Sequence, residues 1–432
     1  MNVLDTLEGR VLVVSCVTTS EAMHQLNQVK DDDGINQICM LRLDINEQLI
    51  ACLSHVLEMY DRSWLSLKLV DCQFRELDDK QEQAFLATLS HFEQLFLQTT
   101  NNAQNTSQYI LPIRGASRVS SLRLCISNVD ESLARMLVGC LSTTDSTLSD
   151  LCLSGSRRCG LQVTILAEAF KGNESLEKLD LGDCQLNDES MFVLLSALHG
   201  HPKLKHLDIS NNNLSDRTLQ ALVEMIVHTN SQLEAVDLGL QRRSLNVSLL
   251  APAIAQNPPS LKRLYLSNCG LVDNKAFPLI DALTHNTHME TLDLSKNRQL
   301  TDNFLIYLGH RLPRIHLATL NVLNLHPSSG SPAAMRAISE GLRQNTHMEL
   351  LRLLFWKELI SARWIQVYIN LNRGGRRALE EKIPPSLWPL ILERAQKCRY
   401  FCPLLVQNSA KDDSIYYLLR NEPALWQQSS SE

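Results

Sequence analysis

The sequence has few aromatic residues and no apolar stretch long enough to cross a membrane. Phe, Trp and Tyr make up 5% of the 432 residues, whereas aliphatic side chains are abundant. A transmembrane helix needs about 18 or more consecutive apolar residues. The short apolar run 11–17 follows Glu8 and Arg10, so it lacks the pattern of a secretory signal peptide. We therefore expect a soluble cytoplasmic protein, with the nucleus as an open alternative.

Motifs for common catalytic chemistry are missing as well. The sequence contains no G-x-S-x-G, no G-x-x-x-x-G-K-[ST], no G-x-G-x-x-G and no H-E-x-x-H. Two histidine pairs, 199/201 and 285/288, have spacings that suit a metal ion, but neither has a third ligand nearby in the sequence. The segment 374–377 (GGRR) is compatible with an anion-binding turn or with an ordinary basic turn. We expect a protein that is not an enzyme and that carries no cofactor and no metal.

The chain also lacks an excess of basic residues. It has 41 Lys and Arg against 47 Asp and Glu, which gives a formal net charge of −6. Nucleic-acid binding depends on a basic surface that neutralises phosphates. The charge balance therefore argues against a nucleic acid as ligand, and we expect no membrane binding either.

The most informative feature is an internal repeat. Residues 176–186 read LEKLDLGDCQL, and residues 204–214 read LKHLDISNNNL. Both segments match L-x-x-L-x-L-x-x-N/C-x-L, the leucine-rich-repeat signature, and each is followed by a helical pattern of apolar residues. The period of about 28 residues and the Asn/Cys mixture at the ninth position resemble the ribonuclease-inhibitor type. Cys72, Cys184 and Cys269 occupy that ninth position, so we expect them to be buried and reduced.

This resemblance implies a right-handed α/β solenoid with the shape of a horseshoe. Stacked strands lie about 4.8 Å apart, whereas packed helices need 8–10 Å. The stack is therefore expected to curve, with a parallel sheet on the concave face and helices on the convex face. The signature predicts repeat starts at Ile38, Trp64, Phe92, Val119, Leu148, Leu176, Leu204, Leu233, Leu261, Met289, Leu320 and Met348.

These starts predict three parts of the chain. Residues 1–37 form an N-terminal cap, with a strand at 10–17 and a helix near 20–29. Residues 38–356 form a solenoid of about 12 repeats, and 357–432 form a helical, Trp-rich C-terminal cap. The phrases INLNRGGRR, PSLWPLILERA and DDSIYYLLRNEPAL resemble a C-terminal segment of leucine-rich-repeat proteins from microalgal genomes. That resemblance covers roughly residues 363–426 and implies no activity.

Three places break the period: residues 101–118, residues 154–160, and a 31-residue unit at 289–319 that is followed by an irregular turn at 327–332. We expect residues 101–118 to loop out, and residues 154–160 (SGSRRCG) to form a small basic excursion after a strand. Insertions in a solenoid collect on one face and often make contacts. Neutral drift of loop length is the alternative, and the sequence leaves both open.

Alternation along each strand places the residue between the last two apolar positions on the concave face. Down the solenoid this row begins basic, becomes acidic in the centre and ends neutral or basic, and a second row lies two residues earlier in each strand. The candidate partner-binding residues from the two rows are Arg42, Lys68, Arg123, Lys178, Asp180, His206, Asp208, Asp237, Arg263, Tyr265, Asp293, Asn324 and Arg352.

The sequence thus favours a protein-interaction scaffold. We expect a monomer whose concave face binds a protein or peptide partner that carries basic groups. The alternative is a regulator of a small GTPase, because one GTPase-activating family uses the same repeat type. That family ends in a strongly acidic tail, which this chain lacks.

Overall fold

A computed structural model of the chain defines two compact units, Met1–Leu245 and Asn246–Glu432. The structure describes residues 2–6, 9–15, 18–29, 34–59, 64–74, 77–99, 110–126, 129–142, 146–156, 162–227, 231–241, 243–326, 329–353, 359–379, 390 and 393–394.

The first unit alternates strands with helices. Its main sheet runs in the order β1 (Asn2–Thr6), β2 (Gly9–Ser15), β3 (Ile35–Leu41), β5 (Trp64–Val70), β7 (Phe92–Gln98), β8 (Ser121–Cys125), β9 (Asp150–Cys152), β10 (Lys178–Asp180), β11 (His206–Asp208) and β12 (Ala235–Asp237). A second, small sheet pairs β4 (Asp44–Ile45) with β6 (Gln73–Phe74). The helical elements are α1 (Thr19–Leu26), α2 (Glu47–Met59), α3 (Asp79–Leu89), α4 (Ile110–Arg114), η3 (Ala116–Arg118), α5 (Glu131–Leu141), α6 (Val163–Gly172), α7 (Asp188–Leu198) and α8 (Asp216–Val227).

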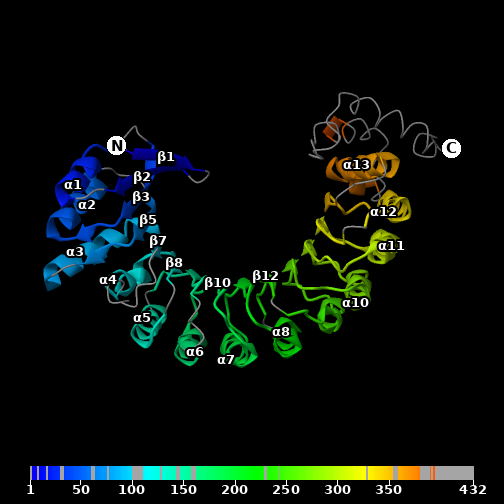
Figure 1. Cartoon of the computed structure of the whole chain (residues 1–432), viewed down its shortest axis with the longest axis horizontal. Coiled ribbons are helices and arrows are strands. Elements are labelled where there is room, and N and C mark those ends of the chain that lie inside the picture. Colours follow the sequence, from blue (N-terminus) through cyan, green and yellow to red (C-terminus); the bar gives the residue numbers. More distant parts are fainter. Residues whose placement is uncertain are drawn as a thin grey trace, which may run out of the picture. The chain divides into compact units, whose positions relative to one another are not determined.

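The second unit repeats the same design. Its strands are β13 (Arg263–Tyr265), β14 (Thr291–Asp293), β15 (Thr319–Asn321) and β16 (Leu350–Arg352), paired in parallel in that order. Its helical elements are η5 (Val247–Leu250), α9 (Ala251–Ala255), α10 (Asp273–Leu283), α11 (Asp302–Arg311), η6 (Leu312–Arg314), α12 (Pro332–Gln344), α13 (Leu359–Arg373) and η7 (Arg376–Leu379). In each unit the helices line one side of the strands, which we call the helix face, and the opposite side is the sheet face (Figure 1).

The core of each repeat lies between its strand and its helix. Leu176, Leu179, Leu181 and Leu186 are at most 1% exposed, as the signature predicts. The following helix α7 begins where the Asn187 side chain accepts a hydrogen bond from the Ser190 amide, and it buries its apolar stripe against the same core. Parallel strands that alternate with helices in sequence, with a leucine core between them, confirm the predicted leucine-rich-repeat fold.

Polar side chains at the ninth position hold successive repeats together. The Asn212 amide donates to the carbonyl of Leu181 in the preceding repeat at 2.9 Å, and its oxygen accepts from the Leu186 amide at 2.9 Å. Asn297 makes the same contacts with Leu266 and Leu271. Asn212 and Asn297 are fully buried. The ninth position therefore pairs backbone groups that the turn would otherwise leave unsatisfied.

The predicted register is wrong in two repeats. Pairing of Ile38 with Leu67 shows that the first repeat starts at Ile35 and not at Ile38. Pairing of Leu292 with Leu320 shows that a later repeat starts at Leu317 and not at Leu320. Arg42 and Asn324 consequently lie at the eighth position, in the turn after the strand, with φ of 55° at both residues. The mid-strand positions belong instead to Cys39 and Asn321.

The ends of the chain and the first interruption also differ in part from expectation. Strand β2 and helix α1 match the predicted N-terminal strand and helix, but β1 was not predicted; it pairs antiparallel with β2. Within 101–118, residues 110–114 and 116–118 are helical and not a loop, whereas 101–109 lie outside the described residues. The excursion at 157–160 and most of the predicted C-terminal cap also lie outside them. The three-part division of the chain stays a prediction.

Candidate functional site

Three aspartates lie side by side on the sheet face of the first unit. Asp180, Asp208 and Asp237 occupy the same position on β10, β11 and β12, and each pairs in register with the next. Neighbouring strands are about 4.8 Å apart, so the three carboxylates form a closely spaced row. We call this row the acidic ladder. All three side chains are half-buried and lie on the predicted face.

Each carboxylate of the acidic ladder also holds the turn that follows its strand. The amides of Gly182, Ser210 and Gly239 donate to the Oδ1 atoms of Asp180, Asp208 and Asp237 at 2.9, 2.9 and 2.7 Å. The bond runs from the residue two positions later, as in an Asx turn. The aspartates therefore have a structural role in addition to their charge.

The close spacing of these acids affects their ionisation. Partial burial raises the pKa of Asp208, and the charge of Asp180 adds to that rise, although the Ser210 amide opposes it. Burial likewise raises the pKa of Asp150, on the neighbouring strand β9. Desolvation and like charge both disfavour an ionised carboxylate. The positive charge of a cationic group at the acidic ladder would favour the ionised carboxylates and oppose both effects.

Basic side chains flank the acidic ladder. Lys178 is exposed and pairs in register with Asp150 on one side and His206 on the other. Lys68 and Arg123 lie on earlier strands of the same sheet, with the Lys68 ammonium 4.3 Å from the centre of the Phe96 ring. On the sheet face of the first unit, Lys68 and Arg123 thus precede the acidic ladder, whereas Cys39 replaces Arg42 at the start of the row.

Cys152 lies between the basic part of the face and the acidic ladder. The sequence predicts an exposed residue at this mid-strand position, but Cys152 is buried, and its thiol donates to Asp180 Oδ2 at 3.1 Å. Burial and the neighbouring Asp180 raise the pKa of Cys152 to about 12. The thiol stays protonated at neutral pH, so it acts as a hydrogen-bond donor and is unsuited to act as a nucleophile.

On the sheet face of the second unit, Arg263 and Tyr265 are half-buried and Arg352 is exposed. Asp293 accepts hydrogen bonds from the Ser295 amide at 2.7 Å and from the Asn321 amide group at 3.0 Å. Both of its oxygens therefore have partners inside the repeat stack. Asn321 was not among the predicted contacts because of the register error, although the phrase LATLNVLNL contains both registers.

The other candidate sites of the sequence have structural roles where the structure describes them. Arg376 of the GGRR segment donates to the Leu342 and Arg343 carbonyls at the end of α12. His288 contacts the Asn257 side chain at 2.9 Å. Within the described ranges, no group of three or more His, Cys, Asp or Glu side chains is arranged to hold a metal ion. No helix in the described part of the chain is long and apolar enough to span a membrane.

A family model matches three of the repeats. The family model described as "Leucine Rich repeat" matches residues 172–195, 200–223 and 285–303. A comparison with curated proteins finds no match. Among solved structures, the tropomodulin C-terminal domain of Caenorhabditis elegans is similar, with 13% identity, a TM-score of 0.33, and coverage of 38% of this chain and 99% of that domain.

The repeat matches and the fold together support a leucine-rich-repeat protein. Repeats of this kind suggest a protein-interaction scaffold. The ribonuclease-inhibitor type and the microalgal resemblance of the C-terminal segment stay predictions.

Proposed function

We propose that this protein is a non-enzymatic scaffold that binds a protein or peptide partner on the sheet face of its first unit. The acidic ladder is the observation that carries the proposal. Three half-buried carboxylates share one row of the sheet, and their mutual repulsion favours a partner that brings Lys or Arg side chains to them. Lys178 and His206 beside the row provide contacts for acidic or polar groups of the same partner.

The sheet face of the second unit is proposed as a separate contact surface, with Arg263, Tyr265 and Arg352 as its contact residues. Tyr265 is the strongest single candidate there, because a tyrosine provides a large, rigid contact area and a hydroxyl group. Asp293 is a weaker candidate than the sequence suggests, since both of its oxygens are already engaged.

The test is partner capture with a charge-neutral variant of the acidic ladder. The sheet-face variant carries Asp180→Asn, Asp208→Asn and Asp237→Asn. Asparagine removes the charge but keeps an oxygen for the turn amide, as Asn321 does naturally toward Leu323. The matched helix-face variant carries Glu168→Gln, Glu189→Gln and Glu224→Gln, which removes the same charge from exposed positions on α6, α7 and α8.

We expect affinity purification with the natural protein and with the helix-face variant to recover the same partner. The sheet-face variant should lose it. Equal recovery by all three proteins would place the binding site elsewhere. A rise in GTP hydrolysis by a small GTPase in the presence of the protein would instead support the alternative function.

A further inference from the structure

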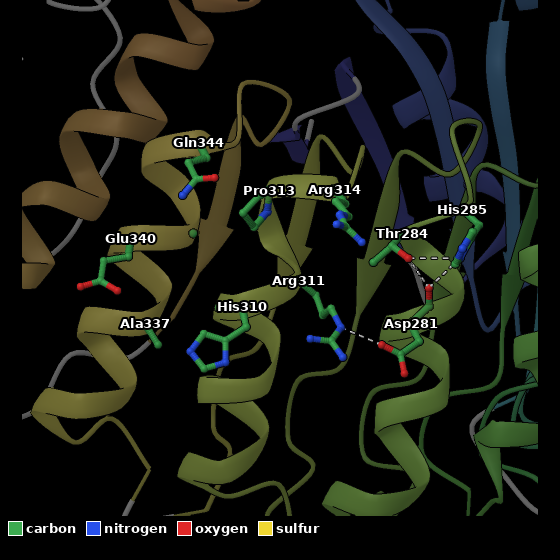
Figure 2. A pocket seen from close by; sticks show the side chains of 12 residues that line it. Asp281, Thr284, His285, His310, Arg311, Pro313, Arg314, Ala337, Glu340 and Gln344 are labelled. Carbon is green, nitrogen blue, oxygen red and sulfur yellow. Dashed lines mark hydrogen bonds and ion pairs between the residues drawn. The ribbon is translucent and has the colours of Figure 1, made fainter.

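The helix face of the second unit contains a hollow of about 830 Å³ at the C-terminal ends of α10, α11 and α12. Figure 2 shows its wall residues, with Asp281 on α10, His310 and Arg311 on α11, and Glu340 on α12. The leucine signature does not point to this site, since its residues come from three repeats and from helix ends that the signature does not specify. We call it the Arg311 cleft.

Small residues create the cleft. A Cβ atom added to Gly309 would lie 2.5 Å from the Ala337 carbonyl carbon, and one added to Gly341 would clash with the Gly309 carbonyl oxygen. Helices α11 and α12 therefore approach each other closely, without side chains between them. Longer side chains on either side then form the walls of an open depression.

One wall of the cleft is a fixed network around Arg311. Its Nε donates to Asp281 Oδ1 at 2.9 Å, and the Tyr307 hydroxyl donates to Asp281 Oδ2 at 2.6 Å. The guanidinium also lies 4.5 Å from the centre of the Tyr307 ring. Partial burial opposes ionisation of Asp281, but the bonds from Tyr307 and Arg311 outweigh it and lower the pKa of Asp281. Asp281 is thus neutralised by Arg311, while Arg311 is held in place for a further contact.

Two other basic side chains of the cleft have no such restraint. Among the described residues, Arg314 and His310 take part in no hydrogen bond or ion pair, and Arg311 Nη1 likewise has no partner. The ends of these helices carry partial negative charge, so any affinity for an anion depends on the arginines. A pre-positioned guanidinium matches a carboxylate geometrically and binds it through two parallel hydrogen bonds.

The acidic side chain on the α12 wall affects which anions the cleft can bind. Glu340 stands exposed on the α12 wall, so the cleft carries a second acidic side chain besides the Asp281 that pairs with Arg311. A polyphosphate chain or an anionic lipid surface would bring closely spaced negative charges to Glu340, whereas peptide carboxylates separated by neutral residues can place one carboxylate at the arginines. We propose that the Arg311 cleft binds an acidic segment of a partner protein, with a Glu or Asp carboxylate held by Arg311 and Arg314. This surface is separate from the acidic ladder and does not depend on the function proposed for it.

Fluorescence anisotropy with the full-length protein tests this binding. The probe is an acetylated, fluorescein-labelled decapeptide of alternating Glu and Ala, and its matched control has Gln in place of Glu. We expect the Glu peptide to bind about tenfold more tightly than the Gln peptide. Arg314→Glu should weaken Glu-peptide binding by about tenfold or more, because it reverses one of the two arginine charges.

Tyr307→Phe is the sharper variant, since it leaves the charge of the cleft unchanged. Loss of the hydroxyl releases Arg311 on one side, and we expect about threefold weaker binding. Arg217→Glu, at an exposed position on α8 of the first unit, and the sheet-face variant should both leave peptide binding within about twofold of the natural protein.

Three results would overturn the proposal. They are equal binding of the Glu and Gln peptides, an unchanged affinity in both Arg314→Glu and Tyr307→Phe, and an equal loss in Arg217→Glu. Inorganic polyphosphate that binds more tightly than the Glu peptide, and does so through Arg314, would also overturn it in favour of a polyanion site.

Discussion

The Asn297 side-chain amide donates a 2.9 Å hydrogen bond to the Leu266 carbonyl, which belongs to the preceding repeat. The same side chain accepts from the Cys269 and Leu271 amides, so one buried residue satisfies three backbone groups of its neighbour. Repeat proteins owe much of their stability to such contacts between adjacent units. The ninth-position residues are therefore expected to set the stability of each repeat interface.

Asn297→Ala should destabilise this interface by about 3 kcal/mol, because it leaves at least two buried amides without an acceptor. The measurement is hydrogen exchange at Cys269 and Leu271, where protection should fall. Asn303→Ala, at an exposed position on α11, is the control and should change protection little. Unchanged exchange at Cys269 and Leu271 in the Asn297 variant would contradict this role of the ninth-position residue.

Cys184→Asn should be tolerated, with a stability change within about 1 kcal/mol. The Cys184 thiol already donates to the Leu153 carbonyl at 3.2 Å and to the Gly182 carbonyl at 3.4 Å. An asparagine would donate to the same carbonyls, as Asn212 does in the next repeat. Urea unfolding provides the comparison, and a loss well above about 2 kcal/mol would show that this slot is too small for asparagine.

His201 should make stability depend on pH. Its Nδ1 accepts from the Leu204 amide at 3.1 Å and the Lys203 amide at 3.3 Å, and burial lowers the pKa of His201 below its ordinary value. Below about pH 6.5 the His201 imidazole of the unfolded chain binds a proton, whereas the folded imidazole resists protonation. The contribution of His201 to the free energy of unfolding is therefore complete above that pH and is lost as the pH falls.

His201→Asn keeps an acceptor at this position but cannot titrate, as Asn173 and Asn286 show in other repeats. Urea midpoints at pH 7 and pH 5 should differ less in the variant than in the natural protein. An identical difference in both proteins would show that His201 does not contribute.

The sequence predicted the repeat architecture well because the leucine signature encodes the core directly. Leu179, Leu207 and Leu292 are all buried at the positions that the pattern assigns. The predicted register failed near Arg42 and Asn324 because the apolar residues around them match the leucine signature in two registers, three residues apart. The positive φ of the eighth position decides between them, and that backbone geometry does not appear in an apolar pattern.

The sheet face could be predicted only in part. Its charges follow from strand alternation, and Asp180, Asp208 and Asp237 lie where the pattern places them. Their bonds to the turn amides depend on the conformation after each strand, which strand alternation does not predict. A substitution to lysine would remove both the charge and the turn contact, and for this reason asparagine is the better probe.

Deletion from Lys357 onward should destabilise the last repeats. Ile365, Ile369 and Leu371 of α13 are buried, and the Asn372 amide donates to the Asn345 and Met348 carbonyls at 2.9 Å. Removing α13 exposes apolar surface of the last repeat at about 25 cal/mol per Å². We expect lower solubility and early unfolding of the terminal repeats.

A deletion that begins at Glu380 is the control, because it keeps α13 and its contacts. Thermal unfolding of the two truncated proteins should separate them, with the longer deletion melting earlier. Equal melting temperatures for the natural protein and the longer deletion would show that this segment is not a cap.

Binding at the acidic ladder is tested most directly by the affinity of the captured partner for three proteins. These are the natural chain, the sheet-face variant and the helix-face variant. Complementary charge acts mainly through association and is screened over about 10 Å at 0.1 M salt. Titration calorimetry at low salt should show about tenfold or greater loss of affinity in the sheet-face variant and less than about twofold change in the helix-face variant. Equal affinities for all three proteins would contradict partner binding at Asp180, Asp208 and Asp237.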